Sequence, residues 1–285
     1  MTLTRENTSR FVQAGAVKVH YHEAGAGPVL LCIHGGAPGA FGWGNFGRNL
    51  EALSKHFRTL IVDLPGYGKS DKPQINGPRT SFYARTFLDM LDALGIAKAH
   101  VLGMATGGAA ALKMAIDAPG RIDRLVVISS PGGLSLFQPM PPKPGSHNYY
   151  GGTGPSMERM RAALENLVYD KSIISDQVLK ERYEESIVPE FMNQAPEGHG
   201  GAPGQTLEEL WPDLHKIQAE TLIIWGRNNT TVNYDHALFM MTRIPNSRVH
   251  IHNKCGLWVP YEKFHEFNSN VIGFLSADLT SRPPE

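Results

Sequence analysis

Short apolar runs alternate with helical patterns along most of this chain, and this alternation is the strongest constraint on its fold. Apolar runs bounded by glycine and proline predict strands, and the segments between them carry apolar residues at helical spacing. Strands separated by helices are typical of a parallel sheet that is buried on both faces. We therefore predict an α/β fold, with a mostly parallel central sheet flanked by helices. Strands are expected at residues 29–33, 59–62, 101–104, 125–129, 221–225 and 249–251, helices at 45–53, 80–94, 106–118, 235–242 and 261–275, and an antiparallel hairpin at 12–22.

The alternation stops at Pro131 and resumes near residue 212. Residues 139–145 are rich in proline, which fixes φ and removes a backbone donor, so they cannot form a helix or a central strand. We interpret residues 1–130 and 212–285 as one core domain and residues 131–211 as a helical lid inserted into it. Within the lid, helices are expected at residues 157–169 and 175–187, and a flexible segment at 195–204.

The composition excludes several classes of protein. Lysine plus arginine equal aspartate plus glutamate, 27 against 27, so we expect no capture of nucleic acid or of a membrane surface. The two cysteines, Cys32 and Cys255, indicate no disulfide framework, and a reducing cytoplasm is the expected location. We also expect no secretion signal and no membrane span. No glycine-rich nucleotide motif and no metal-spaced His/Cys cluster is found, so neither a cofactor nor a metal is expected.

The segment Gly103-Met104-Ala105-Thr106-Gly107 joins an apolar strand to a helical pattern. This is the strand–turn–helix setting of the G-x-S-x-G nucleophile elbow, in which a sharp turn exposes a serine above a parallel sheet. In this chain alanine, Ala105, occupies the serine position.

Several further motifs, taken with this turn, resemble the α/β-hydrolase family, and more closely its carbon–carbon branch, the meta-cleavage product hydrolases of aromatic catabolism. The motifs that carry the resemblance are His34-Gly35-Gly36-Ala37-Pro38-Gly39-Ala40, Gly42-Trp43-Gly44-Asn45, Asp63-Leu64-Pro65-Gly66-Tyr67-Gly68-Lys69-Ser70, Ser130-Pro131-Gly132-Gly133-Leu134, Tyr169-Asp170 with Arg182, Trp225-Gly226-Arg227 and Cys255-Gly256-Leu257-Trp258. The resemblance covers nearly the whole chain.

In that family a serine, a histidine and an aspartate act as one catalytic unit. The resemblance places the nucleophile at Ala105, the acid at Asn229 and the base at Leu257, so none of the three expected side chains is present. It also implies that the backbone amides of Gly36 and Thr106 are the oxyanion donors, which need no particular side chain.

The resemblance further implies a substrate that is a dienol or dienone bearing a carboxylate. Arg182 and Asn45 match positions that help to hold it, and Trp258 matches the aromatic residue beside the missing histidine. Gly35 belongs to the same oxyanion loop. Met104 departs from the family, whose carbon–carbon branch commonly has asparagine before the nucleophile.

Structural explanations compete with these roles. The glycines of the two loops could only permit tight turns. Arg182 could be a solvated helix residue paired with Glu185 or Glu181, and Asn45 could cap the helix that it begins. Trp258 is expected to be a pocket wall, and His34 and Cys32 are not expected to act as base or nucleophile.

From the sequence we therefore expect a protein without a triad that binds a small conjugated molecule with a carboxylate or enolate. We favour a non-hydrolytic, cofactor-independent isomerase, lyase or cyclase. The expected partners are a small-molecule ligand and a second copy of the chain in a homodimer. A catalytically silent sensor or carrier is the first alternative. A hydrolase with a non-standard catalytic apparatus, or an inactivated variant, is the second, and the sequence leaves open whether any reaction is catalysed.

Overall fold

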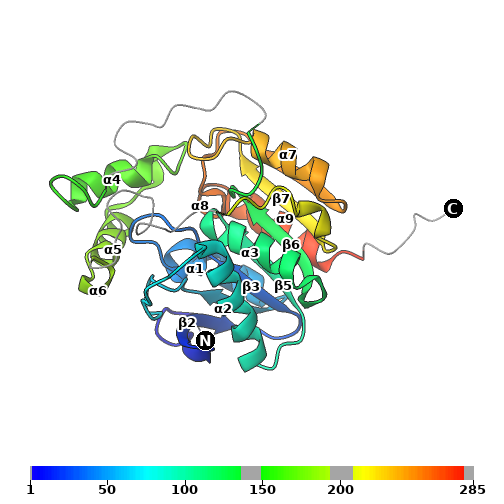
Figure 1. Ribbon diagram of the computed structural model, residues 1–285. Helices are drawn as coiled ribbons and strands as arrows, with labels where there is room; N and C mark the ends of the chain where they lie inside the picture. The colour runs from blue at the N-terminus through cyan, green and yellow to red at the C-terminus, as the bar shows by residue number, and fades with distance from the viewer. Residues whose placement is uncertain (1, 136–148, 193–207, 279–285) are drawn as a thin grey trace.

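An eight-stranded sheet forms the centre of the protein in the computed structural model (Figure 1), which describes residues 2–135, 149–192 and 208–278. The strand order is β1-β2-β4-β3-β5-β6-β7-β8. The first two pairings in this order, β1 with β2 and β2 with β4, are antiparallel, and the others are parallel. The predicted α/β fold with a mostly parallel sheet is therefore confirmed. The strands are β1 (Ser9–Ala14), β2 (Val17–Ala24), β3 (Val29–Ile33), β4 (Arg58–Val62), β5 (Ala99–Met104), β6 (Ile122–Ile128), β7 (Glu220–Gly226) and β8 (Ser247–His252).

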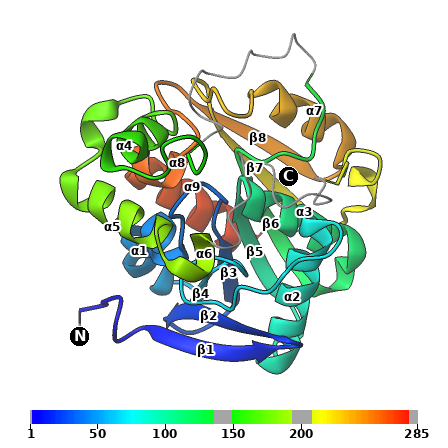
Figure 2. The ribbon, with the colours of Figure 1, turned by 60° about the vertical axis from the view of Figure 1, so that its left-hand side comes forward.

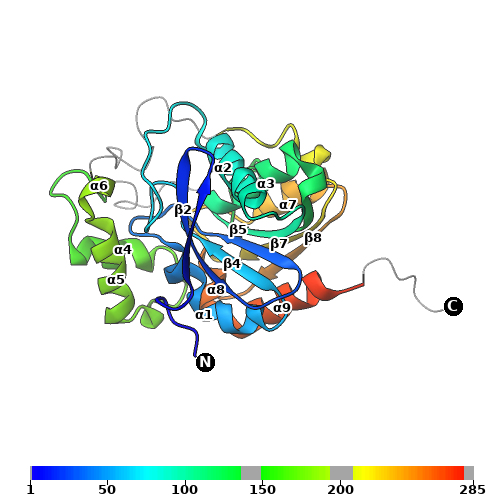
Figure 3. The same cartoon turned by 90° about the horizontal axis from the view of Figure 1, so that it is seen from below.

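Helices cover both faces of this sheet, as Figure 3 shows. The α-helices are α1 (Gly42–Ser54), α2 (Arg79–Ala93), α3 (Thr106–Asp117), α4 (Met157–Glu165), α5 (Asp176–Ser186), α6 (Pro189–Met192), α7 (Asp235–Arg243), α8 (Val259–Glu262) and α9 (Phe264–Ser276). Helices α2, α3 and α7 lie on one face, and α1, α8 and α9 lie on the other. Among the described residues, no helix combines the length and the apolar character that crossing a bilayer requires.

Alternating residues of the strands supply two separate apolar cores. In β3, Leu31 and Ile33 pack in the core beneath α2 and α3, whereas Leu30 and Cys32 pack in the core that includes α1 and α9. This is the period-two pattern of a strand whose two faces are both buried. It explains why the parallel strands are continuous apolar runs in the sequence.

The helix that carries Asn45 begins earlier than predicted, at Gly42. The Gly42 N–H donates to Asp63 Oδ1 at 2.6 Å, so a carboxylate from another loop satisfies an amide at the helix start. The predicted helix at 261–275 is instead two helices, α8 and α9. They are separated at Lys263, whose φ of −114° and ψ of 43° are not helical.

Helices α4, α5 and α6 lie together at one side of the molecule (Figures 1 and 2), and α5 contacts α1. Ser156 and Ser175 cap α4 and α5, since their side chains accept from Arg159 N–H and Val178 N–H. Helix α4 ends at Glu165, earlier than expected, and the sequence analysis did not anticipate α6. The expected proline-rich and flexible segments at 139–145 and 195–204 lie outside the described residues, and the domain boundaries stay a prediction.

Close backbone contact at the end of β7 explains why residue 226 is a glycine, and this contact gives a test of the fold. A β-carbon at Gly226 would lie 1.9 Å from Gly256 O, so Gly226→Ala must displace the loop after β8. We expect it to lower the free energy of unfolding by about 1–3 kcal/mol, the usual cost of overpacking. Gly273→Ala is the control, because a β-carbon there, in α9, meets nothing within 4 Å. This control should raise stability by roughly 0.5–1 kcal/mol. Urea unfolding with equal losses in both variants would contradict the account.

Candidate functional site

The turn between β5 and α3 has the geometry that the sequence predicted for a nucleophile elbow. Ala105 has φ 48° and ψ −117°, a backbone conformation that residues with a β-carbon rarely adopt. Its N–H donates to Ile128 O at 2.9 Å. β-Carbons at Gly103 and Gly107 would lie 2.3 Å from Gly107 O and Ile33 O, respectively. The two glycines therefore allow the close backbone packing that holds Ala105 at the end of β5.

The loop after β3 lies against this turn. A β-carbon at Gly35 would lie 3.1 Å from Ala105 Cβ, and one at Gly36 would lie 2.8 Å from Thr106 Oγ1. Tyr67 Oη donates to Gly36 O at 3.0 Å and fixes this peptide. Within the described residues, neither the Gly36 N–H nor the Thr106 N–H has a hydrogen-bond partner. The structure thus brings Gly35, Gly36, Ala105 and Thr106 together, and the oxyanion role of the two amides stays a prediction.

Asn229 lies in the loop after β7 and is buried. Its side-chain oxygen accepts from the N–H groups of Thr231 and Val232 at 2.9 and 3.1 Å, which closes a tight turn. Its Nδ2 is buried and has no partner among the described residues. The position assigned to the orienting acid therefore has a structural function that an amide oxygen fulfils.

Leu257 lies in the loop after β8. The loop that carries Asn229 contacts this loop directly. The Asn228 N–H donates to Cys255 O at 2.9 Å. Leu257 belongs to the same buried apolar cluster as Met104 and Trp258, and Ala105 packs against this cluster. The side chains at the predicted nucleophile and base positions thus contribute to one apolar surface. That these are the triad positions of relatives stays a prediction.

Arg182 of α5 is buried although it carries a charge, with only 2% of its surface exposed. Its Cζ lies 4.9 Å from the centre of the Trp258 ring. Nε and Nη1 have no hydrogen-bond acceptor among the described residues. Burial lowers the pKa of Arg182 to about 10, although Glu185 opposes this, so the side chain remains a cation at neutral pH.

The expected alternative for Arg182, an ion pair on the surface of its helix, is wrong. Glu185 pairs with Arg5 instead, and Glu181 accepts from Gln177 Nε2 at 3.0 Å. A β-carbon at Gly39 would lie 1.9 Å from Arg182 O, so α5 packs directly against the loop after β3. This contact connects the guanidinium to the part of the structure that carries Gly36.

Asn45 does not cap its helix, because α1 begins at Gly42 and places Asn45 within the first turn. Its Nδ2 donates to Phe41 O at 2.8 Å, and its side chain is buried. The capping alternative is therefore wrong, and the ligand contact of Asn45 stays a prediction.

Two further candidates for a base or nucleophile are structural. Both nitrogens of His34 are engaged, since Nδ1 lies 2.7 Å from Gly35 O and Nε2 accepts from the Leu64 N–H at 3.0 Å. Burial lowers its pKa to about 4. Burial also raises the pKa of the Cys32 thiol, which leaves it protonated and unreactive.

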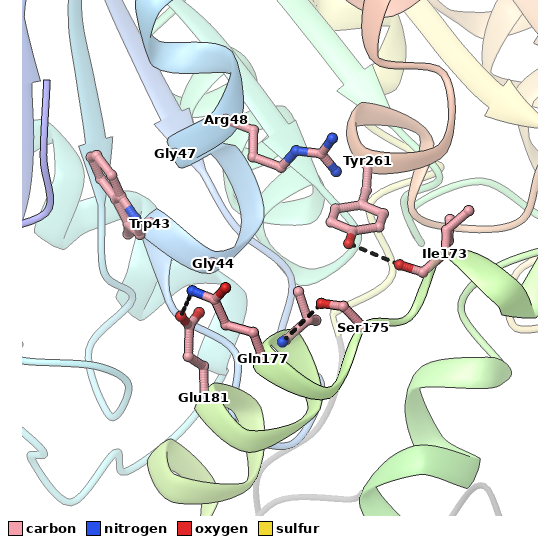
Figure 4. Close-up of a pocket in the computed structure, with 10 residues that line it drawn as sticks. Trp43, Gly44, Gly47, Arg48, Ile173, Ser175, Gln177, Glu181 and Tyr261 are labelled. Carbon is pink, nitrogen blue, oxygen red and sulfur yellow. Dashed lines mark hydrogen bonds between the residues drawn. The ribbon is translucent and has the colours of Figure 1, made fainter. Parts of the chain in front are cut away.

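A stacked aromatic pair connects this region to a separate surface pocket of about 580 Å³ (Figure 4). The Trp258 and Tyr261 rings stack with centroids 4.3 Å apart, and Arg48 Cζ lies 4.6 Å from the Tyr261 ring. The pocket is lined by Trp43, Gly44, Gly47, Arg48, Ile173, Ser175, Gln177, Val178, Glu181 and Tyr261. The sequence analysis missed Arg48 and Tyr261, although each lies three residues after a residue that it singled out and so shares its helical face.

The loop at Asn229 gives a second stability test. Asn229→Ala removes the acceptor for two backbone N–H groups, so we expect a loss of about 1–3 kcal/mol in the free energy of unfolding. Asn229→Asp keeps a side-chain oxygen at the same place and should cost much less. Urea unfolding at neutral pH compares the two variants. An aspartate variant as unstable as the alanine variant would show that the turn does not depend on this acceptor.

Comparison with known proteins shows which family this chain resembles. The family described as the alpha/beta hydrolase fold matches residues 28–264. The 2-hydroxy-6-oxo-6-phenylhexa-2,4-dienoate hydrolase of Comamonas testosteroni is 36% identical over 282 residues, which cover 96% of this chain and 98% of the relative. The 2-hydroxy-6-oxononadienedioate/2-hydroxy-6-oxononatrienedioate hydrolase of Escherichia coli is 33% identical and covers 96% of this chain and 97% of the relative.

A solved structure agrees with these relatives. It is a serine-to-alanine variant of the meta-cleavage product hydrolase from Pseudomonas fluorescens, complexed with acetates. The superposition has a TM-score of 0.82 at 31% sequence identity and covers 93% of this chain and 97% of the other.

These findings overturn the function that we expected from the sequence. A non-hydrolytic isomerase, lyase or cyclase, and equally a silent sensor or carrier, is wrong, because relatives that match almost from end to end are named as hydrolases. The turn at Ala105 and the adjoining loop of Gly35 and Gly36 are present although the three expected triad side chains are absent. Matched across residues 28–264 and along nearly the whole length of its relatives, this chain belongs to the α/β-hydrolase fold family.

Proposed function

We propose that this protein is a hydrolase that cleaves a carbon–carbon bond in 2-hydroxy-6-oxo-dienoates. The support from comparison is that relatives 33–36% identical over 96% of the chain are named for substrates of this class. The substrate is a small molecule with a carboxylate at one end and a ketone further along a conjugated chain. Those two groups need a buried cation and an oxyanion site.

The buried guanidinium of Arg182, with two donors that lack acceptors among the described residues, is the observation that carries this proposal. Buried donors normally have acceptors, and a buried charge is normally paired. The Nε and Nη1 donors of Arg182 have none among the described residues. A carboxylate accepts from a guanidinium in a fork geometry, and would supply the missing acceptors and the missing negative charge. Trp258, which packs beneath the guanidinium, forms an aromatic wall for a flat conjugated chain.

At the other end of the substrate, the ketone oxygen faces the amides of Gly36 and Thr106. These donors stabilise the negative charge that develops when the carbonyl carbon is attacked. Because Ala105 carries no hydroxyl, the attacking oxygen comes from water. The water oxygen joins the carbonyl carbon, the adjacent carbon–carbon bond breaks, and one water proton ends on the departing carbon. The reaction therefore yields a carboxylic acid and a dienol, and needs no cofactor.

This mechanism limits the rate. In a triad hydrolase, binding and oxyanion donors alone retain about 10³–10⁴-fold of acceleration over water. We assign that range to this protein. In the same proposal the helices α4, α5 and α6 form the lid that excludes bulk water, and the protein is a cytoplasmic homodimer.

The anion-binding role of Arg182 is tested by replacing it with methionine. Arg182→Met keeps a long side chain against Trp258 and removes the charge. The wild type should be stabilised by a dienoate or by benzoate, by about 2.7 kcal/mol when the ligand is at one hundred times its dissociation constant. The variant should lose this effect, measured as the ligand-dependent shift in melting temperature. Lys180→Met is the control, because Lys180 is exposed on the same helix. An equal ligand-dependent shift in Arg182→Met would reject the anion-binding role.

A triple variant tests whether the geometry at the three predicted triad positions supports triad chemistry. Ala105→Ser, Asn229→Asp and Leu257→His together should accelerate cleavage of 2-hydroxy-6-oxo-6-phenylhexa-2,4-dienoate. The gain should approach the roughly 10⁶-fold that an intact triad contributes. Each single replacement should change the rate little, because a serine without a base is not activated. The rate is followed by loss of the dienoate absorbance. A folded triple variant no faster than the wild type would contradict the assignment of these positions.

A further inference from the structure

A Ser–His–Asp arrangement lies at the β1 edge of the sheet, away from the turn at Ala105. Ser9 Oγ lies 2.8 Å from His20 Nε2, and His20 Nδ1 lies 2.7 Å from Asp63 Oδ2. The three residues come from β1, β2 and the loop after β4. Three strands separate β1 from β5 in the sheet. Both distances are those of hydrogen bonds, and the histidine links a hydroxyl to a carboxylate as in a catalytic triad.

Asp63 is a fixed and ionised carboxylate. Its Oδ1 accepts from the Gly42 N–H at 2.6 Å, and its Oδ2 also accepts from the Lys69 N–H at 2.9 Å. Burial would raise its pKa, but these donors and the bond from His20 hold the pKa of Asp63 below its usual value. An ionised carboxylate only accepts hydrogen bonds. His20 must therefore donate from Nδ1, and in the neutral ring the Nε2 lone pair faces the Ser9 hydroxyl.

A neighbouring hydroxyl–histidine pair lacks this arrangement and serves as an internal comparison. Thr8 Oγ1 lies 2.9 Å from His22 Nδ1, but it donates its own proton to Thr4 O at 2.7 Å. No carboxylate hydrogen-bonds to His22 among the described residues. Of the two hydroxyl–histidine pairs on this hairpin, only Ser9 and His20 have both a base and a carboxylate that orients it.

The surroundings of Ser9 are accessible and suit an acyl group. Ser9 is partly exposed and shares one face of the edge strand with Phe11, whose surface is 48% exposed. The Phe11 ring lies 4.9 Å from the His20 ring, so it flanks the base. Lys18 Nζ lies 4.8 Å from the centre of the Phe11 ring, so a cation lies beside this platform. An apolar platform and a nearby cation suit a small ester as it becomes an oxyanion.

We propose that Ser9 is a nucleophile, independent of the Ala105 site, which accepts acyl groups from small activated esters. Ser9 Oγ attacks the ester carbonyl carbon while its proton passes to His20 Nε2. The tetrahedral intermediate collapses, the bond to the leaving oxygen breaks, and His20 returns the proton to that oxygen. Water then attacks the acyl group on Ser9 with the same proton transfers, which releases a carboxylic acid and restores the hydroxyl. Asp63 acts through His20 as a positioning residue.

The experiment uses a fluorophosphonate probe on the full-length protein, with the labelled residue identified by peptide mass spectrometry. We expect one label per chain, on Ser9, with fluoride expelled as Oγ bonds to phosphorus. Ser9→Ala should abolish labelling, and His20→Gln should slow it by about 10²-fold, the usual contribution of a general base. Ser54→Ala is the control, because Ser54 is a serine whose hydroxyl donates to Glu51 O and contacts no histidine. A folded wild-type protein with no label on Ser9 would overturn the proposal.

A cysteine variant keeps the test valid if His20→Gln does not fold. Ser9→Cys should react with iodoacetamide about 10²-fold faster than Ser54→Cys, because His20 removes the thiol proton. The two natural cysteines, Cys32 and Cys255, are buried and contribute little background. Equal rates for the two variants would reject the base role of His20.

The outcomes also separate this proposal from the hydrolase function assigned to the Ala105 site. Ser9→Ala should leave cleavage of the dienoate unchanged, and Arg182→Met should leave labelling of Ser9 unchanged. Loss of dienoate cleavage in Ser9→Ala would mean that the two sites are not independent.

Discussion

Close backbone packing around Gly103 and Gly107 is the constraint on which the candidate site depends. Neither glycine can carry a β-carbon, because a β-carbon at either position would lie 2.3 Å from a backbone carbonyl oxygen. This packing forces Ala105 into a backbone conformation that costs on the order of 1–3 kcal/mol for a residue with a side chain. The same contacts set the loop of Gly35 and Gly36 beside the start of α3. The positions of both proposed oxyanion donors therefore follow from this backbone packing and from the hydrogen bond of Tyr67 to Gly36 O, and they need no hydroxyl at position 105.

The charge on Arg182 imposes a second requirement. Placing a guanidinium in the interior is costly unless an anion accompanies it. Its two neighbouring carboxylates on α5 are engaged elsewhere, Glu185 with Arg5 and Glu181 with Gln177. The structure thus keeps a buried cation whose Nε and Nη1 donate to no carboxylate among the described residues. A carboxylate substrate removes this cost on binding. Arg182 therefore lowers the stability of the free protein and raises its affinity for the substrate. This balance is expected where a site is organised for its ligand in advance.

The sequence predicted the fold well where the determinants are local or periodic. The run at β3 and the start of α3 were placed correctly because continuous apolar runs and a glycine-bounded turn specify them. The start of α1 was missed because the carboxylate that binds the Gly42 amide comes from Asp63, which is distant in the sequence. The break between α8 and α9 at Lys263 interrupts a pattern that is helical throughout.

The same distinction applies to the sites. Motif resemblance assigned roles to Ala105, Asn229, Leu257 and Arg182, and these assignments stay predictions. The absence of the triad side chains led to the wrong reaction class. The Ser9–His20–Asp63 chain was not anticipated, because it requires the register that pairs Phe11 with His20 and a loop from beyond β4. Its one sequence signal was weak. It consists of polar residues at alternate positions on both strands of the predicted hairpin.

The central claim is that this fold hydrolyses a carbon–carbon bond with water as the attacking group. The most direct measurement is incubation of the wild-type protein with 2-hydroxy-6-oxo-6-phenylhexa-2,4-dienoate in water enriched in oxygen-18, followed by mass spectrometry of the products. The account predicts benzoate that carries one heavy oxygen, formed faster than in a control without protein, and no such acceleration in Arg182→Met. A substrate that binds but yields no benzoate above the uncatalysed control would contradict it.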